Sequence, residues 1–527
     1  MNHYDIIIIG TGAGGGTLAY RLAPTGKKIL ILERGDFLPK EVQNWDPWAV
    51  AKGRYKTTEM WQDKDGNAFS PYQHYFVGGN TKMYGGALLR LRESDFEQVY
   101  HYDGISPAWP LKYHDFEKYY TQAEYLYHTR GQRGVDPTEP PAEKPYPQPP
   151  LPFEPRMQEV NNLVKKQGYN PTPIPLAVKL PEGSDKVHLT LYDGYPDPTG
   201  SKADSHSIGI TGALEHPNVT LLTNRKAMRI ETDSTGRVAR QVVVDHNSET
   251  ETFSADIIVV SCGAINSAAL LLRSKNEQHP DGLANSSGLV GRNLMIHNNG
   301  VVLAYSAKEN PSAFQKAFLI PDFYHNAEDS KYPLGAIQLM GKADPQLLID
   351  ALGDELTLNG KNLEYYANHI IDFFITAEDL PFVNNRVIAK TDGSIQVCYH
   401  QNNLEAYNRL RQKLINIMDK VAEMDGVAGT TKYFGFKLGN GGVTHQTGTC
   451  RFGTDAMNSV LDLNCKAHDL DNLYVVDTSF FPSSGAVNPS LTAMANALRV
   501  GDHLIERLNA VVDVQTKVGR DSENWIG

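Results

Sequence analysis

Long hydrophobic runs are absent from this chain of 527 residues. The longest apolar stretches, such as IIIIG and ILILE near the N-terminus, have the length of a buried strand. A helix that crosses a bilayer needs about 20 consecutive apolar residues, so we expect no membrane span. The N-terminus also lacks a basic stretch followed by an apolar one, so we expect no secretory signal.

Cysteine is scarce as well. The four cysteines, Cys262, Cys398, Cys450 and Cys465, form no CxxC pair. Four cysteines in so long a chain are too few for a disulfide framework, and without paired spacing they do not indicate a thiolate metal site. The sequence therefore predicts no bound metal ion, and a reducing cytoplasm is the simplest location.

Positive charge is not in excess. The chain has 50 Lys and Arg against 61 Asp and Glu, which gives a net charge of −11. Nucleic-acid binding needs a basic surface, so nucleic acid is excluded as the main partner. The length of the chain favours two domains over one.

The first clear motif lies at the N-terminus, in YDIIIIGTGAGGGTLAYRLA. The apolar run DIIIIG is typical of a buried parallel strand. Gly10, Gly12 and Gly15 complete a G-x-G-x-x-G pattern, which provides a tight turn, room for a pyrophosphate and close helix packing. The segment GTLAYRLA predicts a helix whose first N–H groups face an anion.

A carboxylate follows at the expected distance. The segment KKILILERG predicts a second strand, and Glu33 at its end lies eighteen residues after Gly15. An acid about 20 residues after such glycines binds ribose hydroxyls, so the sequence predicts a dinucleotide site. A negative charge there disfavours NADP but leaves both NAD and FAD open. A tight turn with a solvated Glu33 is the alternative without a ligand.

The rest of the chain indicates a discontinuous nucleotide domain. After residue 218 the pattern predicts a strand and then a hairpin with Asp233 to Gly236 at its tip. The segment SADIIVVSCGAINSAALLLRS predicts a second strand, turn and helix, with Gly263 in the turn. Residues 301–440 mix helical and strand-like segments without a glycine fingerprint, which indicates a separate substrate domain. The C-terminal segment again predicts a strand, a loop and a helix.

Nine prolines lie between Pro137 and Pro155. This density excludes a regular helix or an interior strand. We interpret the segment as an extended arm or connector, with a surface loop or an oligomer contact as alternatives. The segment before it has a helical apolar period from Tyr113 onward.

Two C-terminal segments carry residues suited to catalysis. In VTHQTGTCRFG, a turn rich in Gly and Thr follows His445, which favours a strand end over a helix face. In GAVNPSLTAMANA, Asn488 precedes Pro489, which suits the first turn of a long helix. The dipole of that helix stabilises an anion near Asn488. A structural histidine and a capped helix preceded by a polar residue are the alternatives without catalysis.

Together these motifs resemble the glucose–methanol–choline (GMC) oxidoreductase family of FAD enzymes. The matching segments are GTGAGGGTLAYRLA…ILERG, VGGNTKMYGGALLRLRESDF, SCGAINSAALLLRS…SSGLVGRNLMIH and HQTGTCRFG…NLYVVDTSFFPSSGAVNPSLTAMANA. They follow the family order across nearly the whole chain. The segments VGGNTKMYGGALLRLR, AWPLKY and INSAALLLRS are most similar to the pyranose-oxidase-like and bacterial glycoside 3-oxidase branch.

The resemblance implies an α/β fold (α+β overall), with a Rossmann-like FAD-binding domain and a substrate domain built on a mostly antiparallel sheet flanked by helices. We assign residues 1–100, 200–300 and 441–527 to the first domain, and residues 101–199 and 301–440 to the second, with 137–155 as the proline-rich arm. The predicted cofactor-binding residues are Gly10, Gly12, Ala13, Gly14, Gly15, Glu33, Arg34, Gly78, Gly79, Asn80, Thr81, Met83, Tyr84, Gly85, Gly86, Ala227, Cys262, Gly263, Asp477, Thr478, Asn488, Pro489, Ser490 and Leu491.

The resemblance also implies the catalytic roles. His445, with an imidazole near its ordinary pKa, takes the proton of a substrate hydroxyl, flavin N5 takes the hydride, and Asn488 hydrogen-bonds the same hydroxyl. Fungal pyranose oxidases attach FAD to a histidine of the middle motif, where this chain has Met83. We therefore expect FAD to be bound without a covalent link, in a loop from Gly78 to Gly86.

The activity that the resemblance implies is oxidation of a secondary hydroxyl, at C2 or C3, of a pyranose sugar or glycoside. The electron acceptor is oxygen, a quinone or another carrier. The alternatives are an aliphatic alcohol, aryl alcohol, choline or cyclitol substrate, a flavin lyase without net redox, and an FAD-binding protein without activity. The sequence leaves the oligomeric state open.

Overall fold

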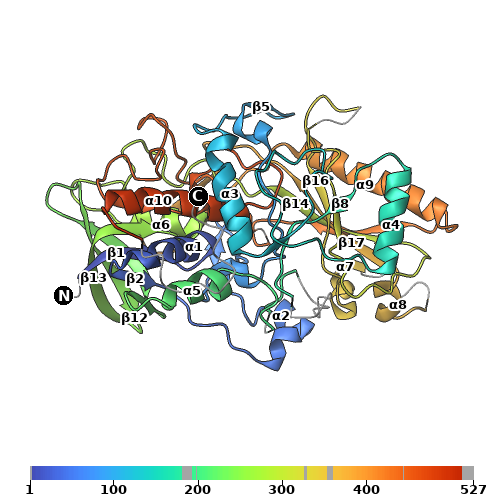
Figure 1. Cartoon of the computed structure of the whole chain (residues 1–527), viewed down its shortest axis with the longest axis horizontal. Coiled ribbons are helices and arrows are strands. Elements are labelled where there is room, and N and C mark those ends of the chain that lie inside the picture. The colour runs from blue at the N-terminus through green and yellow to red at the C-terminus, as the bar shows by residue number, and fades with distance from the viewer. Residues whose placement is uncertain are drawn as a thin grey trace.

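The computed structural model describes residues 3–180, 193–197, 199–325, 329–352, 360–442 and 444–512. A seven-stranded sheet and a six-stranded sheet dominate it. Figure 1 shows the first sheet, with β1, β2, β12 and β13, toward the left of an elongated molecule. The second sheet, with β14, β16 and β17, lies to the right.

The centre of the seven-stranded sheet is parallel. β1 pairs in parallel with β2 and β13, while β10 and β21 extend the parallel part on its two sides. The whole of β2 and the last four residues of β1 are buried, as expected for strands covered on both faces. The strands are β1 (His3–Ile9), β2 (Ile29–Leu32), β10 (Val219–Leu222), β11 (Lys226–Thr232), β12 (Ala239–His246), β13 (Glu249–Val260) and β21 (Leu473–Val475).

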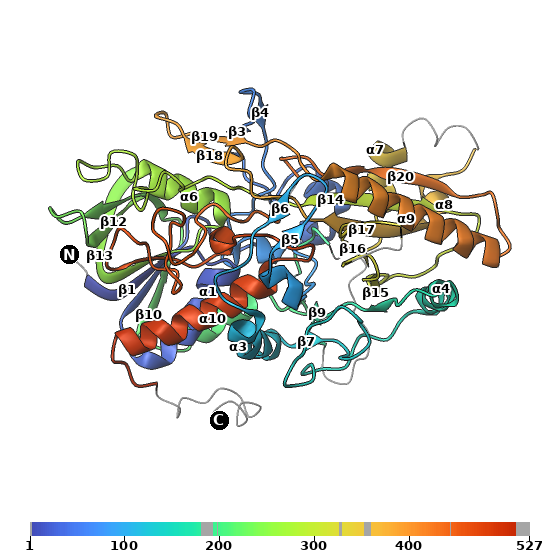
Figure 2. The same ribbon diagram turned by 90° about the horizontal axis from the view of Figure 1, so that it is seen from above.

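This sheet joins three distant stretches of the chain, from both ends and the middle. β11 and β12 form the predicted hairpin, and β12 pairs antiparallel to β13. Figure 2 shows helix α6 on one side of the sheet and helices α1 and α10 on the other. The main helices of this half are α1 (Ala13–Leu22), α3 (Tyr113–Leu126), α6 (Ala264–Arg273) and α10 (Ser490–Arg507).

The six-stranded sheet is antiparallel throughout. Its strands are β8 (Thr172–Pro173), β14 (Asn298–Tyr305), β15 (Phe318–Ile320), β16 (Ala336–Leu339), β17 (Ile370–Ala377) and β20 (Lys432–Lys437). Helix α9 (Leu404–Met424) packs on β14 and β17, and α4 (Pro155–Lys166) packs against α9. The buried residues of α9 recur every three or four positions, which is the period of an amphipathic helix.

The remaining elements are short. The small strands are β3 (Trp61–Gln62), β4 (Ala68–Phe69), β5 (Val99–Tyr100), β6 (Ile105–Ser106), β7 (Thr129–Arg130), β9 (Leu176–Ala177), β18 (Arg386–Ala389) and β19 (Ile395–Cys398). The small helices are α2 (Pro47–Ala51), α5 (Thr211–Leu214), α7 (Ile349–Leu352) and α8 (Leu363–Ala367). No helix in the described part of the chain has both the length and the apolar character that a membrane crossing requires.

The proline-rich segment packs along α3 and contains no helix or named strand before α4 begins at Pro155. The Arg133 guanidinium lies 3.6 Å from the ring centre of Tyr146 and 2.5 Å from a Glu139 carboxylate oxygen. The same guanidinium pairs with Glu124, which is fully buried on α3. The hydroxyl of Tyr113 donates to the carbonyl of Pro141 at 2.5 Å. These contacts hold the segment against the body of the protein.

Candidate active site

A cavity of about 600 Å³ extends from the first sheet to the second. At one end it is lined by Ile9 and Leu32, the last residues of β1 and β2. At the other end it is lined by Val301 of β14 and Phe374 of β17. Ligands of open α/β sheets bind outside the carboxyl ends of the strands, and this cavity begins there.

The glycines of the first motif have two different surroundings. A Cβ atom added to Gly12 would meet nothing within 4 Å, so the backbone at this position is open to the cavity. A Cβ atom on Gly14 would lie 1.9 Å from the carbonyl oxygen of Val476, and one on Gly15 would lie 2.1 Å from that of Gly10. Gly12 therefore leaves room for a ligand, whereas Gly14 and Gly15 allow α1 to pack against the strands.

The carboxylate of Glu33 lies at the same end of the cavity. It accepts hydrogen bonds from the backbone and hydroxyl of Thr11, at 3.2 and 2.5 Å, and from the Gly35 N–H at 3.0 Å. Burial raises the pKa of Glu33, and these hydrogen bonds partly oppose that shift. Beside it, the Arg34 guanidinium lies 3.6 Å from the ring centre of Tyr75 and pairs with Glu59.

The two glycine-rich motifs meet in space. A Cβ atom on Gly79 would lie 3.2 Å from the Cα atom of Gly12, although 67 residues separate them in sequence. The Gly78 N–H donates to the Thr11 hydroxyl at 3.0 Å, which joins the two loops. The structure thus places both glycine motifs on one cavity.

Internal hydrogen bonds brace the middle loop. The Asn80 side-chain oxygen accepts from the backbone N–H of His74 at 3.0 Å. The Thr81 hydroxyl donates to the carbonyl of Gly78 at 2.6 Å and accepts from the Ser205 N–H at 3.0 Å. The two polar side chains that we expected to face a cofactor therefore hold the loop in shape, while both residues also line the cavity.

His445 and Asn488 lie together at the far end of the cavity. The Asn488 Nδ2 atom is 3.4 Å from His445 Nε2, and Gln338 donates to Asn488 Oδ1 at 2.9 Å. Burial, together with the nearby positive charge of Lys316, holds the pKa of His445 well below the ordinary value of 6.5. The expectation of an ordinary pKa was wrong, because the cavity wall removes the imidazole from water. His445 is therefore neutral at neutral pH.

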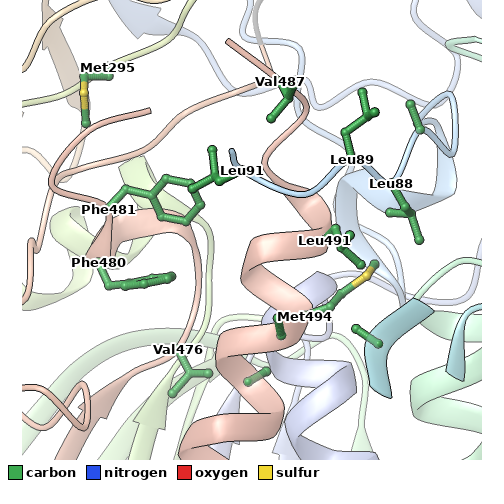
Figure 3. Close-up of a cluster of buried hydrophobic side chains, with 14 of the residues drawn as sticks. Leu88, Leu89, Leu91, Met295, Val476, Phe480, Phe481, Val487, Leu491 and Met494 are labelled. Carbon is green, nitrogen blue, oxygen red and sulfur yellow. The ribbon is translucent and has the colours of Figure 1, made fainter. Parts of the chain in front are cut away.

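Most of the predicted residues line this cavity, but three lie behind the lining. Gly15 is enclosed by the turn at Gly10, and Gly78, with φ of +99°, packs against His206. Leu491 is fully buried in an apolar cluster with Leu88, Leu89 and Leu91 (Figure 3). The predicted residues that line the cavity are Gly10, Gly12, Ala13, Gly14, Glu33, Arg34, Gly79, Asn80, Thr81, Met83, Tyr84, Gly85, Gly86, Ala227, Cys262, Gly263, His445, Asp477, Thr478, Asn488, Pro489 and Ser490.

Several polar residues of the cavity were missed by the sequence analysis. Lys316 and Asp193 form an ion pair of 2.8 Å on the lining. Gln338 on β16 contacts Asn488, and Asn299 on β14 contacts His445, although neither residue lines the cavity itself. His297 also lies beside His445, and although it ends the quoted segment SSGLVGRNLMIH, no spacing in the sequence relates the two histidines.

His74 is a lining residue whose ring is buried and neutral. Its Nδ1 atom is 2.7 Å from the carbonyl oxygen of Tyr55, so Nδ1 carries the hydrogen. Its Nε2 atom is buried and has no hydrogen-bond partner within the described part of the chain. Burial lowers the pKa of His74 to about 4, so the free lone pair of Nε2 persists at neutral pH.

These features fit a long dinucleotide cofactor. Gly12 leaves open space at the N-terminus of α1, where a diphosphate gains from the helix dipole. Glu33 supplies a carboxylate for ribose hydroxyls. A redox ring would then extend toward His445 and Asn488.

Comparison with known proteins gave consistent matches. Two profiles, both described as GMC oxidoreductase, match residues 4–299 and 400–497 of the chain. The 6'''-hydroxyparomomycin C oxidase of Streptomyces lividus is 30% identical over 96% of this chain and 92% of its own length. Paromamine 6'-oxidase of Streptomyces fradiae is 29% identical over 97% of this chain and 93% of its own length.

A solved structure has the same fold. Pyridoxine 4-oxidase from Mesorbium loti aligns with a TM-score of 0.67 at 18% identity, covering 95% of this chain and 99% of that one. The predicted fold, with a Rossmann-like domain and a second, antiparallel sheet, is confirmed.

Proposed function

Because the chain belongs to the GMC oxidoreductase family and is therefore an FAD-dependent enzyme, we propose that it oxidises a secondary hydroxyl of a pyranose sugar or glycoside. The oxidised carbon is C2 or C3, and the product is a ketone. The observation that carries this proposal is the pair His445 and Asn488 on the cavity that Gly12 and Glu33 also line.

His445 and Asn488 have different roles in the proposed reaction. When bound, flavin supplies the hydride acceptor for alcohol oxidation. His445 is neutral, so its Nε2 lone pair takes the hydroxyl proton. Gln338 donates to Asn488 Oδ1, which leaves Asn488 Nδ2 to donate to the substrate oxygen. The two side chains thus hold one hydroxyl between an acceptor and a donor.

The cofactor is held without a covalent bond in this proposal. Gly12 accommodates the diphosphate, and Glu33 binds ribose hydroxyls through its carboxylate. Met83 lies on the cavity at the position where the resemblance implies an attachment histidine. Its thioether does not form that histidyl link, which supports dissociable FAD.

The lining beside His445 suits a sugar. Phe374, Phe436 and Met340 provide apolar surface, which can cover the C–H face of a pyranose. Lys316 and Asp193 provide a donor and an acceptor on the lining that can bond to hydroxyl groups. A simple aliphatic alcohol has no further hydroxyl groups to bond with this ion pair, which favours a polyhydroxylated substrate.

An aminoglycoside is the second candidate substrate. The names of two similar proteins describe oxidases of paromamine and of hydroxyparomomycin C. The carboxylate of Asp193 on the cavity lining would favour an ammonium group on such a substrate. Oxidation would then take place outside C2 and C3.

One experiment separates these candidates. Purified holoenzyme is mixed anaerobically with D-glucose, alkyl glycosides or paromamine, and bleaching of the flavin absorbance is recorded. Product NMR identifies the oxidised carbon, and reoxidation by oxygen or by a quinone identifies the acceptor. Bleaching by glycosides with a C2 or C3 ketone supports the proposal. Bleaching by paromamine alone supports the second candidate, and conversion without bleaching would indicate a lyase.

The variant His445→Ala should retain FAD but slow flavin reduction by about 10²- to 10⁴-fold, because the general base is removed. The side chain lies at the end of the cavity opposite Glu33, so the nucleotide contacts stay intact. Flavin content is measured by absorbance and reduction by rapid mixing. Reduction near the wild-type rate would rule out His445 as the base.

A further inference from the structure

A second histidine lies directly behind His445. The Nδ1 atoms of His297 and His445 are 3.1 Å apart, and the two rings are nearly perpendicular, at 89°. His297 is fully buried and immediately precedes β14. It contacts the Nδ1 edge of His445, while Asn488 faces the Nε2 edge.

The surroundings of His297 determine which nitrogen of each ring carries hydrogen. His297 Nε2 lies 3.3 Å from the carbonyl oxygen of Ser484, which can only accept, so Nε2 is the donor. Neutral His297 then has its lone pair on Nδ1. The bond between the two rings therefore requires His445 Nδ1 to carry hydrogen, which leaves the lone pair of His445 on Nε2.

Asn299 supports the same assignment. Its side-chain nitrogen is placed 3.2 Å from His445 Nδ1, while its Oδ1 atom has no hydrogen-bond partner among the described residues. The two ends of an amide exchange places by a half turn that leaves the rest of the side chain in position. In that orientation Asn299 Oδ1 accepts from the His445 Nδ1–H. Both neighbours then favour one tautomer.

We propose that His297 is a positioning residue, which holds His445 in the Nδ1–H tautomer so that Nε2 faces the cavity as the base. This inference rests on the proposed function, because it assigns a proton-accepting role to His445. When Nε2 takes a proton from the substrate hydroxyl, the Nδ1–H of the imidazolium keeps its bond to His297 Nδ1. His297 itself neither gains nor loses a proton.

Neighbouring hydrogen bonds stabilise the backbone conformation of His297. His297 has φ of +60°, a left-handed conformation that is uncommon outside glycine. The buried carboxylate of Asp379 accepts from the backbone N–H groups of Ile296 and His297 at 2.8 and 2.9 Å, and from the Tyr399 hydroxyl at 2.7 Å. Asp379 therefore stabilises the turn that presents the ring.

Charged groups surround the two rings on several elements. The charge of Lys316, which precedes β15, lowers the pKa of His445. The carboxylates of Asp379 and Glu378, which follow β17, partly oppose the lowering of the His297 pKa by burial. At the end of β20, burial lowers the pKa of Lys437, and the charge of Asp379 partly opposes that shift. The carboxylates therefore lie on the His297 side of the pair, and the lysine acts on the His445 side.

Two substitutions of His297 test the role. His297→Ala removes the acceptor, whereas His297→Asn keeps an oxygen near the position of Nδ1 and tolerates a positive φ. We expect His297→Ala to slow flavin reduction by roughly 10- to 100-fold and to move its low-pH limb to lower pH, because the imidazolium loses its acceptor. His297→Asn should restore the rate to within about threefold of wild type.

The tautomer is measured separately, by NMR of protein labelled with ¹⁵N-histidine. Wild-type His445, assigned with His445→Ala, should show a protonated Nδ1 and an unprotonated Nε2, and His297→Ala should show a mixture of tautomers. Asn298→Ala is the matched control, because Asn298 is the next residue, is also buried, and bonds to the carbonyl of Asn402. This control should keep the wild-type tautomer and pH profile.

The outcomes separate positioning from a structural role. A slow His297→Ala with an altered pH profile, rescued by His297→Asn, supports the proposal. Equal slowing of both variants with an unchanged pH profile, or wild-type behaviour of His297→Ala, overturns it. If His297→Ala does not fold, the NMR measurement on the wild-type protein decides. A wild-type His445 that carries its hydrogen on Nε2 overturns the proposal. The NMR measurement needs no substrate, so it stays decisive if no sugar reduces the flavin.

Discussion

The ring of His445 has polar neighbours at both of its nitrogen atoms. His297 and Asn299 lie at the Nδ1 edge, and Asn488 lies at the Nε2 edge. Burial and the positive charge of Lys316 keep the imidazole neutral. A histidine with an ordinary pKa of 6.5 would be partly protonated at pH 7 and so partly inactive as a base.

The pH dependence of flavin reduction follows from this shift. His445 must be neutral to accept a proton, so the rate falls as the pH drops through its pKa. Because that pKa is held below 6.5, the rate should be level from about pH 7 upward and should decline only in more acidic solution. Rapid-mixing reduction with saturating substrate, from about pH 5 to about pH 9, measures this. A low-pH limb centred above pH 7 would contradict the environment described for His445.

Among the elements, the turn between β1 and α1 contains glycines with different structural roles. Gly10, with φ of +104°, makes the turn, and Gly14 and Gly15 bring α1 close to the strands. Gly12 alone has free space beyond its missing side chain. Its φ of −65° is accessible to any residue, so nothing in the backbone requires a glycine there.

A matched pair of substitutions separates folding from cofactor binding. Gly12→Ala should leave the stability of the apoprotein near wild type, because its Cβ meets no atom, but should weaken FAD binding at least tenfold by filling the diphosphate space. Gly15→Ala should lower the free energy of unfolding by about 1–3 kcal/mol, because its Cβ collides with the turn. Urea unfolding of the apoproteins and FAD titration measure the two effects. Equal loss of stability in both variants would contradict this division.

At the scale of the whole molecule, the cavity joins distant parts of the chain. Residues near 10, 80, 263, 445 and 488 all contribute to its wall. A ligand bound there contacts the first sheet, the middle loop and the start of α10 together. Binding energy therefore adds directly to folding stability, since the unfolded chain has no such site.

FAD should accordingly raise the melting temperature in a concentration-dependent manner. At a free FAD concentration of 100 times Kd the stabilisation is about 2.7 kcal/mol. Because Met83 offers no histidyl attachment, acid precipitation should release all of the flavin into the supernatant. Calorimetry with added FAD, and absorbance of the supernatant, measure these effects. Flavin that remains with the precipitate would show a covalent link.

Local patterns in the sequence were sufficient for part of this picture. The strand, glycine turn and helix around Gly10 to Gly15 follow from hydrophobic periodicity and from the φ angles that glycine permits. The hairpin at Asp233 to Gly236 follows from the same rules. The fold and the pair of His445 and Asn488 also needed the order of motifs along the chain, which is still information in the sequence.

By itself, then, the sequence determined the elements, the family and the residue types available for chemistry, because these depend on short-range patterns. The tertiary structure decided which of them share a surface. It brought Gly79 against Gly12, set His297 behind His445 and moved Gly78 and Leu491 out of the lining. Such placements depend on packing between segments far apart in the chain, and no local spacing records them.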